Sequence, residues 1–453
     1  MKRNSKWLRI PGLAVYTGIA SVLCLSCSSN SYEGKIVAVE LAGEDPESAQ
    51  LVLLDPEKPE KEGTLILKDF NSASAPNLSH EGRYLYFQGK EEGGDPWQIW
   101  MLDLKKKDLT RITDLPENCT DPASLPDGTV IFSRESQIQG TEVNDLWKIH
   151  RDGCCLTRLT FNPAKNLYAS VLKEGRVLYS STQVYPETQE ADLMVMRPDG
   201  SKSEIYSGGN FDLHPSSGGS ESRDGYIYFI SGQGQLSRVL HRRPLHTFEN
   251  LSKAIPGNFA AVKPLNDGSC LVSYRPSDNE SFGLYRFDPG SDQVPTPLFQ
   301  TENRLSDPVA IAAMEMRPRI LPSPVDPGNP TALLMSQDIN HSMLQVRQGL
   351  MGDTLADRIR ISTLEGELAV VECKEDGSFY LKVDADQPLR FETLNSQGEI
   401  VRGPSDWIYL RPNERRACTG CHADPELAPR NIQPLAVKED PVLLSAGKKE
   451  TSY

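Results

Sequence analysis

Five consecutive residues near the C-terminus have the spacing of a known cofactor attachment site. Cys418, Cys421 and His422 form a Cys-x-x-Cys-His pattern, which is typical of a c-type haem. Two thiols at this spacing can each form a thioether with one porphyrin, and the histidine that follows can then bind the iron as its proximal ligand. The sequence therefore predicts one covalent haem c on Cys418 and Cys421, with His422 as the proximal iron ligand.

Two other kinds of site use the same thiol spacing. A thioredoxin-like dithiol should open a helix after a strand in a βαβ unit, and this sequence has no α/β pattern. A four-ligand zinc site needs a second Cys or His pair, and none follows His422. The pattern favours haem, and a structural role for the two cysteines is the alternative.

The rest of a haem environment must come from other parts of the chain. No His or Met follows His422, so a sixth ligand would come from earlier residues, and His341 and Met343 are the candidates. The competing roles are a polar loop histidine and a gap-filling methionine. Arg415 and Arg416 could pair with the haem propionates, or lie solvated at the surface. Without a sixth ligand, the iron would be open to a small ligand.

The N-terminus has the features of an export signal. Basic residues within 2–9 precede an apolar run over 13–25, which is too short for a permanent span. Cys27 follows a small residue and resembles the lipidated cysteine of a bacterial lipobox. Residues 1–27 are therefore predicted to be a lipoprotein-type signal, with a plain signal peptide as the alternative. The protein is expected to be exported, periplasmic or in the cell envelope, and attached to a bacterial membrane through Cys27.

Composition and charge exclude several classes of protein. The 453 residues are 38% hydrophobic, too apolar for a disordered chain, and no long apolar stretch follows the N-terminus. The net charge of -14 makes nucleic acid an unexpected partner. Gly and Pro are spread along the chain, which favours short strands and turns.

A repeated phrase runs through the first two-thirds of the sequence. An acidic or polar residue and a glycine precede an alternating apolar strand, with glycines 82, 128, 175, 225 and 268 spaced 43 to 50 residues apart. Further strands and turns lie between them, which makes about four strands a unit, as in propeller blades. Five clear units and one weaker unit predict a six-bladed β-propeller over 33–315. The phrases at 145–153 and 192–200 resemble the TolB-like propeller family, which implies a fold rather than a function.

A second β unit follows a Pro-rich crossing at 317–327. Alternating apolar runs separated by Gly-containing turns predict a small β-sandwich-like domain over 316–404. The residues 405–453 are expected to form a short haem-binding C-terminal segment. The predicted fold class is thus all-β: a six-bladed propeller, a small sandwich and a haem segment.

Several short runs resemble the middle domain of the hydrazine synthase alpha subunit family. These are Asp-Gly-Ser-Phe at 376–379, Pro-Leu-Arg-Phe at 388–391, the run 407–416 before the haem motif, and Asp-Pro-Glu-Leu-Ala-Pro at 424–429. The resemblance implies a propeller followed by a haem-bearing β domain. The sequence ends 31 residues after His422, without the family enzyme's further haem domain, and residues 423–452 lack the Tyr associated with its active haem. Hydrazine synthase activity itself is therefore not expected.

The resulting functional expectation is an exported monohaem cytochrome-like protein. It would transfer electrons or carry out redox chemistry on a small ligand, with an unidentified redox partner or other subunit; whether it is an enzyme stays open. The alternative is a non-catalytic propeller lipoprotein that binds a partner, with a structural Cys-x-x-Cys-His segment. Five further cysteines (Cys119, Cys154, Cys155, Cys270 and Cys373) are an odd number, so they imply no complete set of disulfides.

Overall fold

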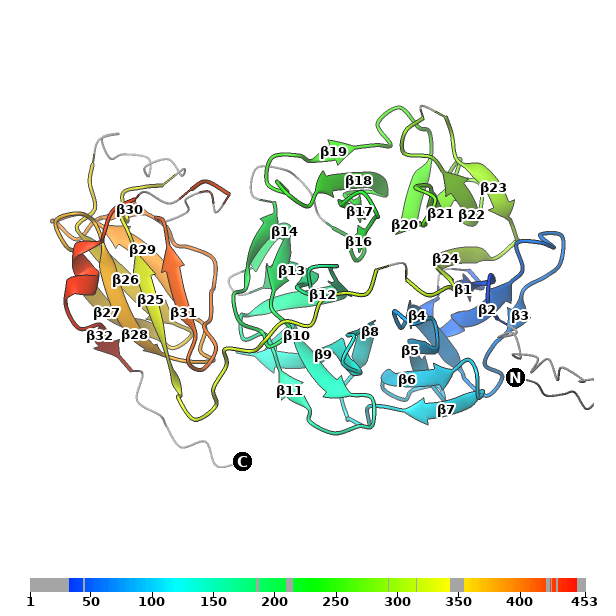
Figure 1. The fold of residues 1–453 in the computed structure, drawn as a ribbon, viewed down its shortest axis with the longest axis horizontal. Coiled ribbons are helices and arrows are strands. Elements are labelled where there is room, and N and C mark those ends of the chain that lie inside the picture. The colour runs from blue at the N-terminus through cyan, green and yellow to red at the C-terminus, as the bar shows by residue number, and fades with distance from the viewer. Residues whose placement is uncertain are drawn as a thin grey trace, which may run out of the picture.

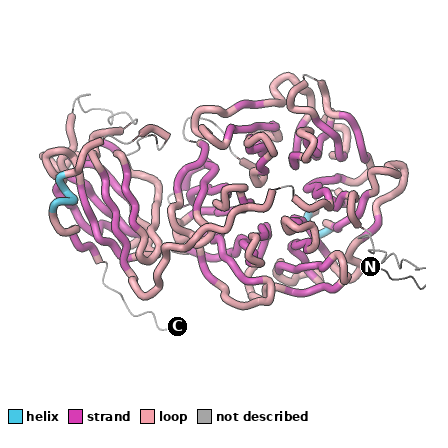
Figure 2. Tube along the Cα trace, in the orientation of Figure 1, coloured by secondary structure: helices cyan, strands magenta, loops and turns pink. Residues whose placement is uncertain are grey.

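Almost all regular structure in the computed structural model is β-strand (Figure 1). The helical elements of the described residues are two 3-10 turns, η1 (Pro46–Ser48) and η2 (Leu435–Lys438), and Figure 2 shows them as short pieces among strands. None of the helices described could cross a bilayer. The structure describes residues 32–43, 45–184, 187–208, 215–291, 293–314, 316–342, 354–420, 424, 426–428 and 431–445.

Six four-stranded blades form a ring and confirm the predicted propeller (Figure 1). Each blade is antiparallel, because its strands are joined by short turns. A single parallel bridge between Asn144 and Lys165 joins the third and fourth blades. The first blade contains β24 (Arg304–Ala310), β1 (Ile36–Leu41), β2 (Gln50–Leu54) and β3 (Thr64–Leu65), and the second contains β4 (Ser72–Leu78), β5 (Tyr84–Lys90), β6 (Gln98–Asp103) and β7 (Asp108–Arg111). The third blade contains β8 (Cys119–Ser124), β9 (Thr129–Ile138), β10 (Thr141–His150) and β11 (Thr157–Arg158), and the fourth contains β12 (Ala164–Val171), β13 (Val177–Val184), β14 (Glu187–Met196) and β15 (Glu204–Ser207). The fifth blade contains β16 (Ser220–Glu221), β17 (Tyr226–Ser231), β18 (Gln235–Leu240) and β19 (Glu249–Asn250), and the sixth contains β20 (Asn258–Pro264), β21 (Cys270–Arg275), β22 (Gly283–Phe287) and β23 (Thr296–Phe299).

The first blade closes the ring with strands from both ends of the propeller sequence. β24 pairs antiparallel with β1, so its innermost strand comes from the far end. Side chains on β1 alternate between two interfaces. Ile36 and Ala38 pack against the sixth blade and Val37 and Val39 against the second. The first unit is weak in sequence because only three of its strands lie there, and β3 is two residues long.

The segment after β24 crosses one face of the propeller (Figure 1). The Arg317 guanidinium donates a 2.6 Å hydrogen bond to the carbonyl of Pro126. Gly82 and Gly175 have positive φ, and a Cβ atom on either one would meet the backbone of Ala313 or Arg319. These two glycines therefore allow the crossing segment to lie directly on the blades.

A bulge recurs on the innermost strands around the central channel. Ala75, Asp121, Tyr168 and Asp307 all have positive φ, at places where the strand register shifts. Asp121 and Asp307 line a channel cavity of about 110 Å³ together with Lys263. Burial in the channel, and then the charge of Asp307, raise the pKa of Asp121 to about 6.

Two four-stranded sheets form the predicted sandwich and share one apolar core. Leu334 and Leu381 on one sheet pack in the same cluster as Ile359 and Ile361 on the other. The first sheet has the order β31 (Arg415–Cys418), β25 (Thr331–Ser336), β28 (Phe379–Asp384) and β32 (Val442–Leu444); the second has β27 (Gly366–Glu372), β26 (Arg358–Thr363), β29 (Arg390–Leu394) and β30 (Ile400–Arg402).

The sandwich continues beyond residue 404, where the sequence predicted its end. β31 and β32 pair parallel with β25 and β28 and form both edges of the first sheet. Neither is long enough to show alternation, which is why the sequence suggested a separate segment there. The C-terminal segment is thus part of the domain.

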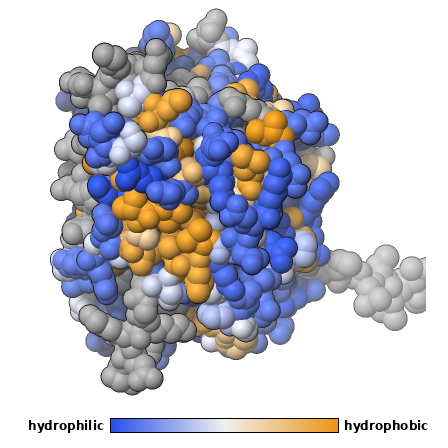
Figure 3. Space-filling model, turned by 90° about the vertical axis from the view of Figure 1, so that its left-hand side faces the viewer, coloured by the Kyte–Doolittle hydropathy of each residue, from blue (hydrophilic) through white to orange (hydrophobic). Residues whose placement is uncertain are grey.

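Apolar side chains gather on the outer surface of the molecule on the side of the sandwich (Figure 3). Exposed large apolar residues of this domain include Val370 on β27 and Val442 and Leu443 on β32. Single exposed apolar residues are common on soluble proteins, whereas contiguous patches of apolar residues are less common.

Candidate haem site

The first cysteine of the haem motif is the last residue of β31. Ser336 on β25 lies opposite Cys418, and the Gln337 amide donates a 3.0 Å hydrogen bond to the Cys418 carbonyl. β31 ends because the chain turns at Gly420, where a Cβ atom would meet the backbone of His341. The motif therefore begins at the edge of the sandwich, packed against the 338–341 turn. Cys421 and His422 lie outside the described residues.

An apolar cavity lies beside Cys418, between the two sheets. Its volume is about 200 Å³, and Cys418 and Gly420 are among its walls. The other large apolar walls are Leu334, Ile339, Ile359, Phe379, Phe391 and Ile408. Burial raises the pKa of the Cys418 thiol, which thus remains protonated at neutral pH.

This cavity fits one part of a porphyrin. The macrocycle has apolar faces, and the cavity walls are apolar and next to a thiol that could attach its edge. Its volume is below the roughly 300–1,000 Å³ of a typical small-molecule pocket, so these walls would enclose a porphyrin only in part.

Of the two candidates for the sixth ligand, the structure describes one. The backbone of His341 lies against Gly420, inside the motif, and its amide donates a 3.2 Å hydrogen bond to the Asp338 carbonyl. The sequence separates His341 from the motif by many residues, and the pairing of β25 with β31 brings them together. Met343 lies outside the described residues.

The two arginines predicted to contact propionates have different surroundings. Arg416 is 12% exposed and donates hydrogen bonds of 3.1 and 2.8 Å to the carboxylate of Glu414, which is fully buried. Arg415 is exposed, and alternation along β31 turns it away from Cys418. Arg416 is thus engaged within the protein, and Arg415 is the less constrained candidate.

The run before the haem motif forms the joint between the sandwich and the propeller. The ring of buried Tyr409 lies 5.6 Å from that of Phe161, and the guanidinium of Arg411 lies 4.7 Å from the same ring. Glu414 accepts a 3.1 Å hydrogen bond from the amide of Lys202. Burial raises the pKa of Tyr409 well above its usual value, so its phenol stays neutral. Sequence reasoning missed this joint; its only signal is the density of Tyr, Arg and Glu in a run without strand alternation.

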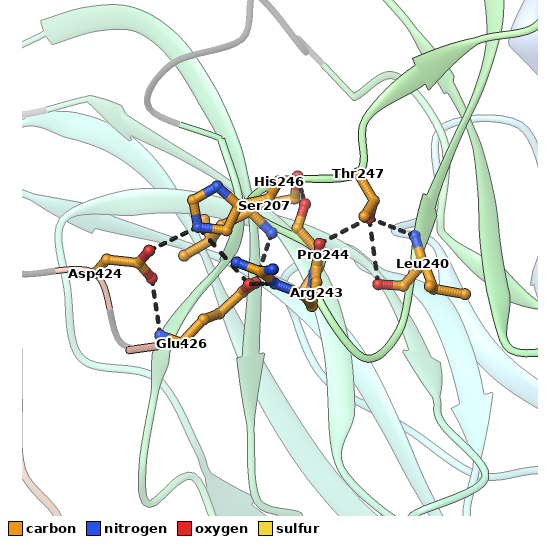
Figure 4. Close-up of polar contacts among 9 residues, drawn as sticks. Ser207, Leu240, Arg243, Pro244, His246, Thr247, Asp424 and Glu426 are labelled. Atoms are coloured by element: carbon orange, nitrogen blue, oxygen red, sulfur yellow. Dashed lines mark hydrogen bonds and ion pairs between the residues drawn. The ribbon is translucent and has the colours of Figure 1, made fainter. Parts of the chain in front are cut away.

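A second contact with the propeller lies just after the motif (Figure 4). A carboxylate oxygen of Asp424 lies 2.6 Å from His246 Nε2 in the β18–β19 connection, and Glu426 accepts a 2.8 Å hydrogen bond from the Leu245 amide. Burial opposes ionisation of Asp424, but hydrogen bonds from the Glu426 amide and His246 lower its pKa overall. The residues on both sides of the motif are therefore fixed to the propeller.

This second cluster resembles a metal site in residue type but not in charge. Ligand atoms of His246, Asp424 and Glu426 lie within 4.8 Å of one another. However, Arg243 lies 3.6 Å from Glu426 and compensates its charge. The group is therefore described as an ion-pair network, with Arg243 as the positive charge beside Glu426.

Comparisons with known proteins find similarity over most of the chain. Residues 337–423 match the family model described as "Hydrazine synthase alpha subunit middle domain". The curated hydrazine synthase subunit alpha of Kuenenia stuttgartiensis is 20% identical over 83% of this chain, and the match spans 63% of the subunit. The chain therefore covers less than two-thirds of the length of that relative.

The solved structure of a hydrazine synthase agrees with this match at the level of the fold. The Kuenenia stuttgartiensis hydrazine synthase structure has a TM-score of 0.77 at 19% identity and covers 89% of this chain and 71% of that one. TolB from Acinetobacter baumannii has a TM-score of 0.46 at 14% identity and covers 61% of this chain and 66% of its own. The protein described here thus shares the fold of this hydrazine synthase structure over most of its length, and its residues 337–423 are similar to the middle domain of the hydrazine synthase alpha subunit.

Proposed function

We propose that the protein is an exported monohaem cytochrome-like protein that transfers electrons or handles a small redox ligand. The observation that carries the proposal is the position of Cys418. Its thiol lies at an apolar cavity inside the family's middle domain, at the start of the Cys-x-x-Cys-His motif.

Each residue has a distinct role in this proposal. Cys418 and Cys421 would hold the haem covalently, and His422 would be its proximal ligand. Arg416 is paired with Glu414 and Arg415 faces away from Cys418, so neither arginine is assigned to a propionate. The haem would supply one-electron transfer or ligand binding at iron. The apolar walls would exclude water from the enclosed part of the ring, and His341 is the described candidate for a further iron ligand.

Hydrazine synthesis is not part of the proposed function. Hydrazine synthesis is in the name of the relative, and 20% identity does not extend that reaction to this chain.

A pyridine haemochrome spectrum of protein co-expressed with a cytochrome c maturation system tests the proposal. We expect a c-type band that survives acid-acetone extraction, at one haem per chain. The matched control is the double variant Cys418→Ser and Cys421→Ser, which should be colourless but folded. A colourless wild-type protein under these conditions would refute the cofactor assignment.

Export and membrane attachment form a separate part of the proposal. Cys27 would become the lipidated N-terminal residue of the mature protein, in the cell envelope. Metabolic labelling with palmitate should label the wild-type protein but not the variant Cys27→Ala. A wild-type protein without label would rule out the lipid anchor.

A second candidate function rests on the propeller. A cavity of about 200 Å³ lies below the crossing segment, with walls that include Lys173, Lys263 and Met314. In this alternative, the blades bind a partner and the motif is structural. Partner binding that is undiminished in the double cysteine variant would favour it over the haem function.

A further inference from the structure

We propose that Cys154 and Cys155 are a reversible dithiol–disulfide couple on the rim of the propeller. The two residues follow β10 in the turn that leads to β11, far in sequence from the haem motif. This inference is independent of the haem assignment, because it concerns different cysteines.

The geometry of the turn brings the two thiols together. Their sulfur atoms lie 2.8 Å apart, and both residues are exposed. Cys155 has a φ of +64°, which is unusual for a non-glycine residue. The Asp152 carboxylate accepts a 3.0 Å hydrogen bond from the Cys154 amide and fixes the turn on its other side. Two sulfur atoms at this separation need only a small movement to form a bond.

The other cysteines of the described residues do not compete for this pair. Cys119 and Cys270 are buried within blades, and Cys373 and Cys418 lie in the sandwich. A bond between the two adjacent cysteines would leave Cys119, Cys270 and Cys373, which lie in separate cores and have no part in this couple.

The proposed step is a thiol–disulfide exchange with a small or protein disulfide. Contact with Cys155 and Asp152 raises the pKa of Cys154 to about 12, so Cys154 keeps its proton. The Cys155 thiolate attacks the donor, its S–S bond breaks, and one donor thiolate leaves. Cys154 then loses its proton to water and attacks the sulfur of Cys155, which releases the second donor thiolate. The two cysteines are oxidised by two electrons and the donor disulfide is reduced to two thiols.

A bond between adjacent residues favours a redox role over a stabilising one. A disulfide between adjacent residues encloses no intervening residues, so loop-closure entropy contributes nothing to the stability of the fold. Neighbouring Cα atoms are about 3.8 Å apart, whereas ordinary disulfides span about 4.4–6.8 Å. Such strain makes a disulfide more easily reduced, and exposed, strained disulfides are typically the regulatory or catalytic ones.

Mass spectrometry of one tryptic peptide tests the proposal on the full protein. Cleavage after Arg151 and Arg158 releases both cysteines together. In oxidised glutathione we expect this peptide to be lighter by two hydrogen atoms and to resist alkylation. In reduced glutathione it should accept two alkyl groups, and the change should be reversible.

The variant Cys154→Ser distinguishes exchange from simple oxidation. It lacks the resolving thiol, so a glutathione adduct should accumulate on Cys155, whereas the wild-type protein should accumulate none. Two alkylatable thiols in the wild-type peptide after prolonged oxidation would overturn the proposal. So would a metal ion bound stoichiometrically to the turn and lost in this variant.

Discussion

The propeller and the sandwich are closed in different ways. Five of the six blades are built from consecutive strands, and each packs on both neighbours. The sandwich instead receives its two edge strands, β31 and β32, from the end of the chain, paired parallel to strands much earlier in sequence. The haem motif begins where the first of these strands ends. The proposed haem chemistry is thus expected in the sandwich, where pairing between distant strands brings residues together. The repeated blades of the propeller support this domain.

The largest expected effect comes from breaking the joint between these two regions. Glu414→Ala would leave Arg416 without its partner in a buried site, and the amide of Lys202 without its acceptor. We expect a loss of about 3–5 kcal/mol in urea unfolding, with earlier proteolysis between the domains. Asp406→Ala, at an exposed position nearby, should change stability by less than about 0.5 kcal/mol. Equal effects of the two variants would contradict the role of Glu414.

Substitutions of two buried leucines compare the apolar cores of the sandwich and the propeller. Leu334 in the sandwich and Leu236 in the propeller are both buried, and each change to Ala should cost about 2–5 kcal/mol in unfolding free energy. Leu334 also lines the cavity beside Cys418, so only Leu334→Ala should shift the Soret band of the haem-loaded protein. A Soret band shift of the same size in Leu236→Ala would mean that the cavity does not hold the haem.

Substitutions at two glycine turns test the contact between the propeller and the crossing segment. Gly175 and Gly268 occupy equivalent turns with positive φ, but only Gly175 lies against the crossing segment, at Arg319. Gly268→Ala should cost about 1–2 kcal/mol in thermal or urea unfolding because of the backbone alone. Gly175→Ala should cost at least about 1 kcal/mol more, because its neighbour is backbone and cannot yield easily. Identical costs would mean that the segment lifts away freely.

The smallest expected effect is a pH dependence that arises in the channel. The pKa of Asp121 in the folded protein is raised to about 6, so its contribution to stability is greatest below about pH 4 and declines as the pH rises to about 6. Asp121→Asn should therefore gain stability over the wild type across this window, by about 1 kcal/mol after allowance for water in the channel. Parallel stability profiles of the two proteins would show that Asp121 ionises normally.

The repeat made most of the fold predictable, and the non-local contacts remained hidden. Glycine turns and period-two strands identified the blades, because each blade is local in sequence. β31 and β32 were not recognised, since strands of four and three residues have too little pattern. The partners of Arg416 and Asp424 could not be predicted, because Glu414 lies at a domain joint and His246 lies in a propeller loop. The sequence identified Cys418 as a candidate residue for covalent haem attachment. It could not predict the cavity beside Cys418, because residues of both sheets form its walls.

The shared first blade has a consequence for how the protein is made. β1 and β2 have apolar side chains on both faces, and they emerge from the ribosome long before β24, which completes their sheet. Until β20–β23 have been synthesised these strands have no sixth blade to pack against, and until β24 follows they have no innermost partner. Unpaired apolar strands are prone to aggregate, so the nascent chain should depend on a chaperone that holds its first strands until the ring can close. The haem motif lies later still in the sequence, so in an exported chain it would reach the cell envelope after every strand of the propeller.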